Sequence, residues 1–308
     1  MDALSEVLRH SRFAANVTLD VTAHAPWCVG VPASESPVRA HLVLEGTCTL
    51  RTGDGETLAL KAGDFAFLPA GGAHLIGSST ETQATSLASL LRTSVEGELL
   101  PVRLGRNGTV TRWISFTFTC ERHMAQPLLG ALAPVVRVNL SGAAPLQWIA
   151  GELGLVLSAS DAPFLGAAAT RARLAELVFI EALSRHVQAT PPGGQGWLAG
   201  LNDRFVGRAL ALVHGRPSEP WTVERLGRLV GLSRSALAER FVLVMGEPIF
   251  SYLTAWRLTL AAESLLNSTR TIESVSRSAG YESAGAFSCA FKRAFGKPPS
   301  VWRRKRRR

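Results

Sequence analysis

The sequence predicts an α+β protein of two domains: a β-barrel with a helical extension, then an all-α domain that contains two helix-turn-helix units. In the first half of the chain, short apolar runs alternate with glycine-rich turns. Residues 190–196, TPPGGQG, form a linker, because this density of proline and glycine prevents regular structure. Beyond the linker, a ten-residue pattern occurs twice about 50 residues apart, which indicates a duplicated helical unit.

Length and composition are those of a globular protein. The 308 residues suffice for two separate cores, and the contents of 46% hydrophobic and 19% charged residues exclude a disordered chain. No apolar run reaches the roughly 18 residues that span a bilayer. The acidic first residues lack the basic end and the apolar stretch of a signal peptide. We therefore expect a cytoplasmic protein.

The N-terminal domain begins with a predicted short helix over residues 1–9, which carries Leu4 and Leu8. Apolar runs between turns then predict strands at residues 40–44, 47–50, 57–60, 65–68 and 73–76. The alternation continues over residues 113–120. Many short strands with such turns indicate a barrel, which we place at residues 10–125.

Helices are predicted after the barrel, at about residues 126–189, with separate segments over 145–158 and 163–187. The second segment is amphipathic, with apolar Leu174, Leu177 and Val178 flanked by arginines. Such a helix can pack its apolar face on its own barrel.

The C-terminal domain, residues 197–302, opens with a helix that Asn202 or Asp203 caps and Gly215 ends. A longer helix over residues 248–267 separates the two copies of the repeat. At 1.5 Å per residue it spans about 30 Å, which is close to one turn of B-DNA.

The two copies, TVERLGRLVG at residues 222–231 and TIESVSRSAG at residues 271–280, each predict a helix that threonine caps and glycine ends. A second helix follows each copy, capped by Ser233 or Ser283. The inward faces of these helices carry apolar residues four apart, Leu237 and Phe241 in one copy and Phe287 and Phe291 in the other. A small residue at Gly227 or Ser276 allows close helix crossing. The predicted helix-turn-helix units are residues 222–242 and 271–293.

The positive charge of the chain is concentrated in its last third. Residues 215–308 hold 17 Lys and Arg against 7 Asp and Glu, a net charge of +10, whereas residues 1–214 carry −1. Neutralisation of phosphates is the expected use of such a surplus, and binding of this kind weakens steeply with salt. Residues 303–308, RRKRRR, are expected to be a disordered basic tail.

Two segments of the barrel resemble the cupin motifs. Residues 63–74, GDFAFLPAGGAH, match the second motif at every spacing, and residues 41–46, HLVLEG, match the end of the first. The resemblance implies that residues 1–189 form a sensor domain and that its barrel is a double-stranded β-helix. Where metal-binding cupins have a further histidine, this chain has Arg39. What remains is a candidate divalent-metal set of His41, Glu45 and His74, and the same residues with Arg39 are candidates for effector contact.

The C-terminal third resembles the DNA-binding region of the AraC/XylS regulators, on residues 280–303, GYESAGAFSCAFKRAFGKPPSVWR. The resemblance implies a transcription regulator, commonly an activator, that binds operator DNA as a homodimer through its N-terminal helices. Its effector is a small molecule, and RNA polymerase is a further partner if the protein activates transcription.

The start of each second helix should face a major groove. In the first unit the candidate DNA-binding residues are Arg234, Ser235, Ala238, Glu239 and Arg240. In the second unit they are Ser283, Ala284, Gly285, Ser288, Cys289, Lys292 and Arg293. Arginine reads guanine and glutamate accepts from cytosine, whereas alanine and glycine offer no hydrogen bond. We therefore predict that the first unit supplies most sequence discrimination and that the second mainly binds phosphate.

Two alternative functions are compatible with the sequence. One is a metal-dependent cupin enzyme fused to a DNA-binding domain, against which the missing histidine counts. The other is a regulator that senses oxidants through Cys28, Cys48 or Cys120, and Cys289 beside the DNA is a further candidate redox thiol. Because the four cysteines are widely separated, neither a cysteine zinc site nor a disulfide framework is expected.

Overall fold

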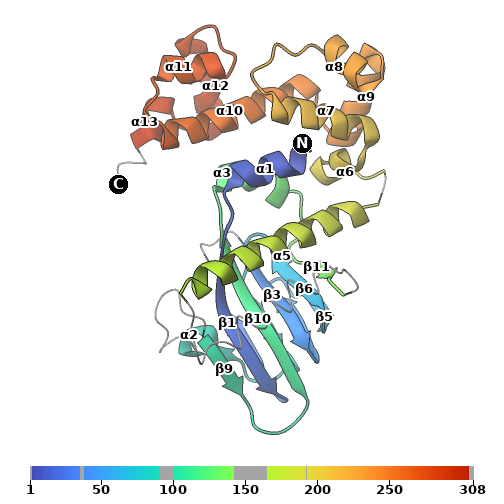
Figure 1. The fold of residues 1–308 in the computed structure, drawn as a ribbon, viewed down its shortest axis with the longest axis vertical. Coiled ribbons are helices and arrows are strands. Elements are labelled where there is room, and N and C mark those ends of the chain that lie inside the picture. Colours follow the sequence, from blue (N-terminus) through green and yellow to red (C-terminus); the bar gives the residue numbers. More distant parts are fainter. Residues whose placement is uncertain (1, 35–37, 91–99, 142–164, 192, 305–308) are drawn as a thin grey trace. The chain divides into compact units, whose positions relative to one another are not determined.

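The computed structural model describes residues 2–34, 38–90, 100–141, 165–191 and 193–304. The chain forms two compact units (Figure 1). The β unit comprises Arg12–Cys120 and Leu132–Gln188, and the helical unit comprises Met1–Ser11, Glu121–Ala131 and Ala189–Arg308.

The β unit contains two sheets. The six-stranded sheet has the order β11-β6-β3-β10-β1-β9, and the five-stranded sheet has the order β5-β4-β7-β2-β8. The strands of the first sheet are β1 (Ala14–His24), β3 (Val38–Glu45), β6 (Asp64–Leu68), β9 (Leu100–Leu104), β10 (Val110–Thr119) and β11 (Val136–Asn139). Those of the second are β2 (Cys28–Val31), β4 (Thr47–Thr52), β5 (Thr57–Lys61), β7 (His74–Gly77) and β8 (Thr85–Ser86). Short helix α2 spans Leu87–Leu90. Each strand that the sequence predicted is present.

The core of the β unit lies between the two sheets. It combines side chains of the first sheet, such as Val21 and Trp113, with side chains of the second, such as Val29, Leu50 and Ile76. In β1 every second residue from Val17 to Ala23 is buried, which is the pattern of a strand with one buried face. The sequence predicts no specific strand over these residues.

The opposite face of the six-stranded sheet is covered by helix α5, Ala167–Ala189 (Figure 1). Phe179 of this helix stacks on Phe118 at 4.5 Å between ring centroids and meets Phe67 edge-on at 5.5 Å. The helix therefore packs on its own sheet, and it leaves Leu177 and Ile180 exposed. The helix predicted over residues 145–158 lies outside the described residues, as do residues 305–308 of the basic tail.

The helical unit gathers three separate parts of the chain. Its helices are α1 (Ala3–Ser11), α3 (Arg122–Leu129), α6 (Trp197–Asn202), α7 (Arg204–Gly215), α8 (Val223–Val230), α9 (Arg234–Met245), α10 (Ile249–Asn267), α11 (Ile272–Ser278), α12 (Ala284–Phe295) and α13 (Pro299–Arg304). Helix α1 packs against α3 and α7, and its His10 lies 3.0 Å from a carboxylate oxygen of Glu263 on α10. The compact unit thus includes α1 and α3, which the sequence analysis placed in the domain of residues 1–189.

Each helix-turn-helix unit has the predicted caps. The hydroxyl of Thr222 accepts a hydrogen bond from the Arg225 amide at 3.1 Å, and Thr271 does the same for Ser274. Ser233 and Ser283 cap α9 and α12 through the amides of Ala236 and Ala286. Gly231 and Gly280 follow the first helices with φ of 88° and 80°, a conformation that favours glycine. Asp203 caps α7, as one of the two predicted residues.

Replacement of Gly227 by alanine is expected to destabilise the helical unit by about 1–2 kcal/mol, because α8 and α9 cross there. An added Cβ would lie 2.7 Å from the backbone oxygen of Leu232, so the helices would have to separate. Gly285→Ala is the matched control, because its Cβ meets nothing within 4 Å and a helical alanine stabilises by about 0.5–1 kcal/mol. Urea unfolding of both variants tests this, and equal midpoints would contradict it.

None of the described helices is long and apolar enough to cross a membrane.

Candidate nucleic-acid interface and ligand-binding interior

The start of α9 presents polar side chains to solvent. Arg234 is exposed, and its Nε lies 3.0 Å from Oε1 of Glu224, which is also exposed. The hydroxyl of Ser235 lies 3.3 Å from that of Ser233, and Glu239 is exposed. An exposed ion pair of this kind contributes about 0–1 kcal/mol, so DNA can replace Glu224 as the partner of Arg234 at little cost.

Arg240 does not point freely into solvent. Its Nε lies 3.0 Å from both carboxylate oxygens of Asp203, and its guanidinium lies 5.2 Å from the ring centre of Phe205. Although burial opposes it, hydrogen bonds from Arg240 and from backbone amides hold the pKa of Asp203 below its usual value. The arginine therefore fixes α9 against the start of α7, a partnership that the sequence analysis missed.

The matching surface of α12 offers few hydrogen-bonding groups. Gly285 is exposed, and the hydroxyl of Ser288 donates to the carbonyl of Ala284 at 2.7 Å. The hydroxyl of Ser283 is used in the cap. Further along the helix, Cys289, Lys292 and Arg293 are exposed. Helices α9 and α12 thus occupy the same place in their units but differ in chemistry. The start of α9 carries polar and charged side chains, whereas the start of α12 carries few hydrogen-bonding groups.

Helix α10 joins the two helix-turn-helix units within one body. Its 19 residues span about 28 Å at 1.5 Å each. Arg257 on this helix donates to the carbonyls of Pro217 and Glu219 at 2.7 and 2.9 Å. A Cβ added at Gly280 would lie 2.9 Å from its guanidinium. Arg257 therefore links the segment before α8 to the turn of the second unit.

The interior of the β unit brings two of the predicted histidines together. The Nε2 atoms of His41 and His74 lie 2.8 Å apart, and Nδ1 of His41 lies 3.0 Å from the Ser115 hydroxyl. Burial, with neighbouring His74 and Arg39, lowers the pKa of His41 well below 6.5. Burial also lowers the pKa of His74 to about 4. Both rings are therefore neutral at pH 7, and one donates to the other. The pairing of β10 with β3 places Ser115 opposite His41, and the sequence alone does not indicate this pairing.

Glu45 does not join the two histidines. The pairing of β3 with β10 shifts between Val43 and Glu45, and such a bulge turns the following side chain away from its expected face. Glu45 is exposed, whereas His41 and His74 are each 3% exposed. Within the described ranges, no group of three or more His, Cys, Asp or Glu is placed to hold a metal ion.

Arg39 and His41 line a small interior space of about 20 Å³, together with Trp113 and apolar residues of both sheets. This is room for about one water molecule. The Nε of Arg39 is buried and makes no hydrogen bond to the part of the chain that the structure describes. Burial lowers the pKa of this guanidinium. The Nε–H of Arg39 is therefore a hydrogen-bond donor without an acceptor among the described residues, at the edge of an apolar interior.

Two of the candidate redox cysteines are in poor positions for reaction. Cys28 and Cys48 are buried. Burial raises the pKa of Cys28 above its usual value, and it raises the pKa of Cys48 to about 12. A thiol with such a pKa is protonated at pH 7 and is a weak nucleophile. Cys120 is half-buried, and Cys289 is exposed.

Both halves of the chain are similar to known proteins. A family model described as Cupin matches residues 2–188, and one described as Helix-turn-helix domain matches residues 226–305. The DNA-binding domain of the transcriptional factor AdpA, solved with a target DNA, is 26% identical over 34% of this chain and 97% of its own, with a TM-score of 0.32. ToxT from Vibrio cholerae aligns over 95% of both chains with 12% identity and a TM-score of 0.37.

Two relatives are similar over their whole length. An AraC-like transcription regulator from Streptomyces lividans is 31% identical over 99% of this chain and 98% of its own. The HTH-type transcriptional regulator AlkR from Acinetobacter baylyi is 29% identical over 98% of this chain and 99% of its own. With a cupin domain followed by two helix-turn-helix units, and with this full-length similarity, the chain belongs to the AraC-like transcription regulators.

Proposed function

We propose that this regulator reads its operator unequally, mainly through α9, while α12 holds the DNA by its phosphates. The observation that carries the proposal is the difference between matching positions: Arg234 and Ser235 on α9 face solvent where α12 has Ala284 and Gly285. Lys292 and Arg293 are positioned to neutralise phosphates. The length of α10, about 28 Å, suits two neighbouring major grooves.

Sequencing of the DNA fragments bound by the purified protein tests this proposal. We expect a composite site in which one half shows strong base preferences and the other, about one helical turn away, shows weak ones. Assignment of the halves follows from repeating the selection with an Arg234→Ala variant, which should remove preferences only from the strong half. Two halves of equal information would contradict the proposal.

The cupin interior is the proposed sensor. Arg39 supplies an unpaired donor there, and the neutral His41 and His74 supply hydrogen-bonding groups among apolar walls. A small effector with an acceptor group suits this chemistry, and it acts by shifting the populations of conformations that differ in DNA affinity. Repeating the DNA selection with candidate effectors tests this role.

We infer that the chain is a regulator and not an enzyme. It acts on DNA in the cytoplasm, and it contacts RNA polymerase if it activates transcription. The relatives named as transcription regulators support this inference. A divalent metal held by the two histidines remains the basis of the enzyme alternative. Elemental analysis that finds one equivalent of metal in DNA-binding-competent protein would favour it. If a variant with serine at 28, 48 and 120 still responds to oxidant, the alternative in which Cys28, Cys48 or Cys120 senses the oxidant is excluded.

Dimerisation through α5 is the proposed assembly, because the side of this helix away from the sheet exposes Leu177 and Ile180, 46% and 40% accessible. Leu177→Glu combined with Ile180→Glu is expected to weaken the dimer at least about tenfold, since charges replace apolar contacts. Arg173→Ala, on an exposed position of the same helix, is the control. Analytical ultracentrifugation at tens of micromolar distinguishes the outcomes, and a wild-type chain that is monomeric there would remove the dimer.

A further inference from the structure

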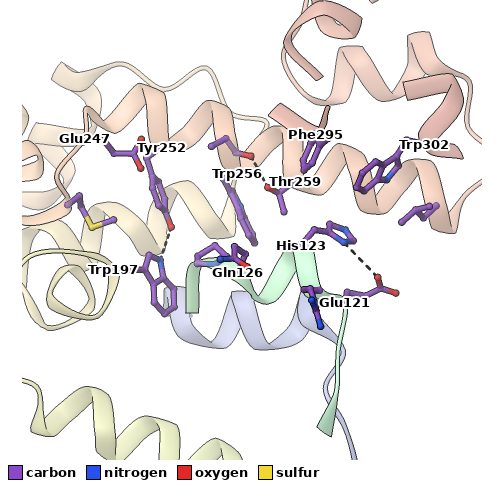
Figure 2. Close-up of a pocket in the computed structure, with 15 residues that line it drawn as sticks. Glu121, His123, Gln126, Trp197, Glu247, Tyr252, Trp256, Thr259, Phe295 and Trp302 are labelled. Carbon is purple, nitrogen blue, oxygen red and sulfur yellow. Dashed lines mark hydrogen bonds and ion pairs between the residues drawn. The ribbon is translucent and has the colours of Figure 1, made fainter. Parts of the chain in front are cut away.

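A cleft of about 940 Å³ lies within the helical unit, between α3 and α10 (Figure 2). Five of its fifteen lining residues are aromatic: Trp197, Tyr252, Trp256, Phe295 and Trp302. Pockets for drug-sized ligands have volumes of roughly 300–1,000 Å³ and apolar walls with a few polar groups. The cleft therefore has the size and the lining of a small-molecule site, and it is separate from the DNA-reading surface and from the cupin interior.

Two residues of the cleft wall carry buried nitrogen atoms that lack partners among the described residues. Trp256 is 2% exposed, and its indole N–H makes no hydrogen bond to any described residue. His214 stacks on the ring of Trp256 at 4.2 Å, so packing fixes the indole in place. On the opposite wall, Nε2 of His123 is also buried without a partner among the described residues. Buried polar groups in proteins are normally satisfied, and exceptions often mark a site for a ligand.

The charge of the lining is opposite to that of the domain around it. Glu121 and Glu247 contribute two carboxylates, against the single guanidinium of Arg122. No described residue forms an ion pair with Glu247, and partial burial raises its pKa. Nδ1 of His123 lies 3.9 Å from Glu121, but burial lowers the pKa of this imidazole, so it is neutral at pH 7. The lining is thus acidic in a unit whose residues 215–308 carry a net charge of +10.

We propose that this cleft binds a lipophilic cation, a molecule with an aromatic or polycyclic body that carries an ammonium or phosphonium charge. The aromatic rings attract a cation through their faces and bury its apolar body. The carboxylates of Glu121 and Glu247 neutralise its charge, whereas they repel an anion of the same shape.

An occupant would contact three separate elements. Tyr252 lies on α10 beside the first helix-turn-helix unit, Phe295 ends the second helix of the other unit, and His123 lies on α3 (Figure 2). Along the chain α3 directly follows β10, which pairs with β1, and α1 directly precedes β1. The cleft is therefore lined both by α3, which directly follows a sensor strand along the chain, and by the DNA-binding helices, and binding there changes operator affinity.

A pair of probes of matched shape and opposite charge tests the proposal on the full-length protein. Tetraphenylphosphonium is expected to bind, with quenching of tryptophan fluorescence and a signal in calorimetry. Tetraphenylborate is expected to bind at least about tenfold more weakly, even though the formal charge of the protein, +9, favours the anion. Neutral triphenylphosphine oxide offers an acceptor without charge and should bind with intermediate affinity.

Variants then locate the site. Glu247→Gln should weaken phosphonium binding about fivefold or more and leave the neutral oxide unaffected, because only the cation uses the carboxylate. Glu282→Gln removes an equal charge from an exposed position outside the cleft and should change neither. Absence of phosphonium binding, borate binding of equal strength, or equal effects of the two variants would each overturn the site. An operator affinity unchanged by saturating phosphonium would overturn its regulatory role.

Discussion

Replacement of Arg234 by alanine is expected to lower the affinity of the protein for its selected operator about 10- to 100-fold and to relax base preference at one or two positions. The reason is that a bidentate arginine to a guanine is worth about 1–3 kcal/mol of discrimination. In the protein alone the guanidinium is held near Glu224 by an exposed ion pair, which is weak and easily exchanged for a base. Competition binding with single-base operator variants measures both effects.

Arg293→Ala is the matched control, because it removes the same side chain from an exposed position of α12. If this arginine contacts phosphate, its loss should weaken binding to all sequences by a similar factor and lower the salt dependence by about one unit of slope. Base preference should stay unchanged. The unequal-readout proposal is wrong if Arg293→Ala alters base preference while Arg234→Ala weakens all sequences alike.

The helix-turn-helix units were predictable from the sequence because their determinants are local. A capping hydroxyl at Thr222 or Ser233 and a glycine at 231 act within one turn of the helix that they begin or end. The tight crossing at Gly227 was also predictable, since the partner helix begins only seven residues later, at Arg234. The asymmetry between Arg234 and Ser235 of one copy and Ala284 and Gly285 of the other follows from aligning the copies. The structure adds that Arg234, Ser235 and Gly285 are exposed.

What the sequence could not supply is pairing between distant segments. The inclusion of α1 and α3 in the helical unit depends on contacts such as His10 with Glu263, 253 residues apart. Likewise, the bond of Arg240 to Asp203 joins two helices that are individually predictable. Spacing along a strand predicts that Glu45 faces the same way as His41, but a bulge depends on the partner strand. The aromatic cleft combines α3, α10 and α12, so no single stretch of sequence indicates it.

Acid is expected to destabilise the helical unit, because His214 on α7 is buried as a neutral imidazole. The side chain is 1% exposed, and burial, with a smaller effect of His10, lowers its pKa to about 3. Its Nε2 accepts a hydrogen bond from the Tyr252 hydroxyl at 2.6 Å, and that oxygen accepts one from Nε1 of Trp197 at 2.8 Å. Protonation of His214 would add a proton to Nε2, which conflicts with the proton that the Tyr252 hydroxyl donates to it. It would also place an unpaired charge in the core.

The direction of the effect follows from the two pKa values. The unfolded chain binds a proton at this histidine below about pH 6.5, whereas the folded chain does so only near pH 3. Stability that is fully present above pH 6.5 is therefore lost as the pH falls, by about 2 kcal/mol between pH 7.5 and pH 5. His214→Phe keeps the stacking on Trp256 and cannot titrate, so its urea midpoint should depend less on pH, although the lost hydrogen bond lowers its stability at pH 7.5. Tryptophan fluorescence follows both proteins through unfolding. An equal loss in both between pH 7.5 and pH 5 would show that other groups, such as His41 and His74 in the β unit, cause the acid sensitivity.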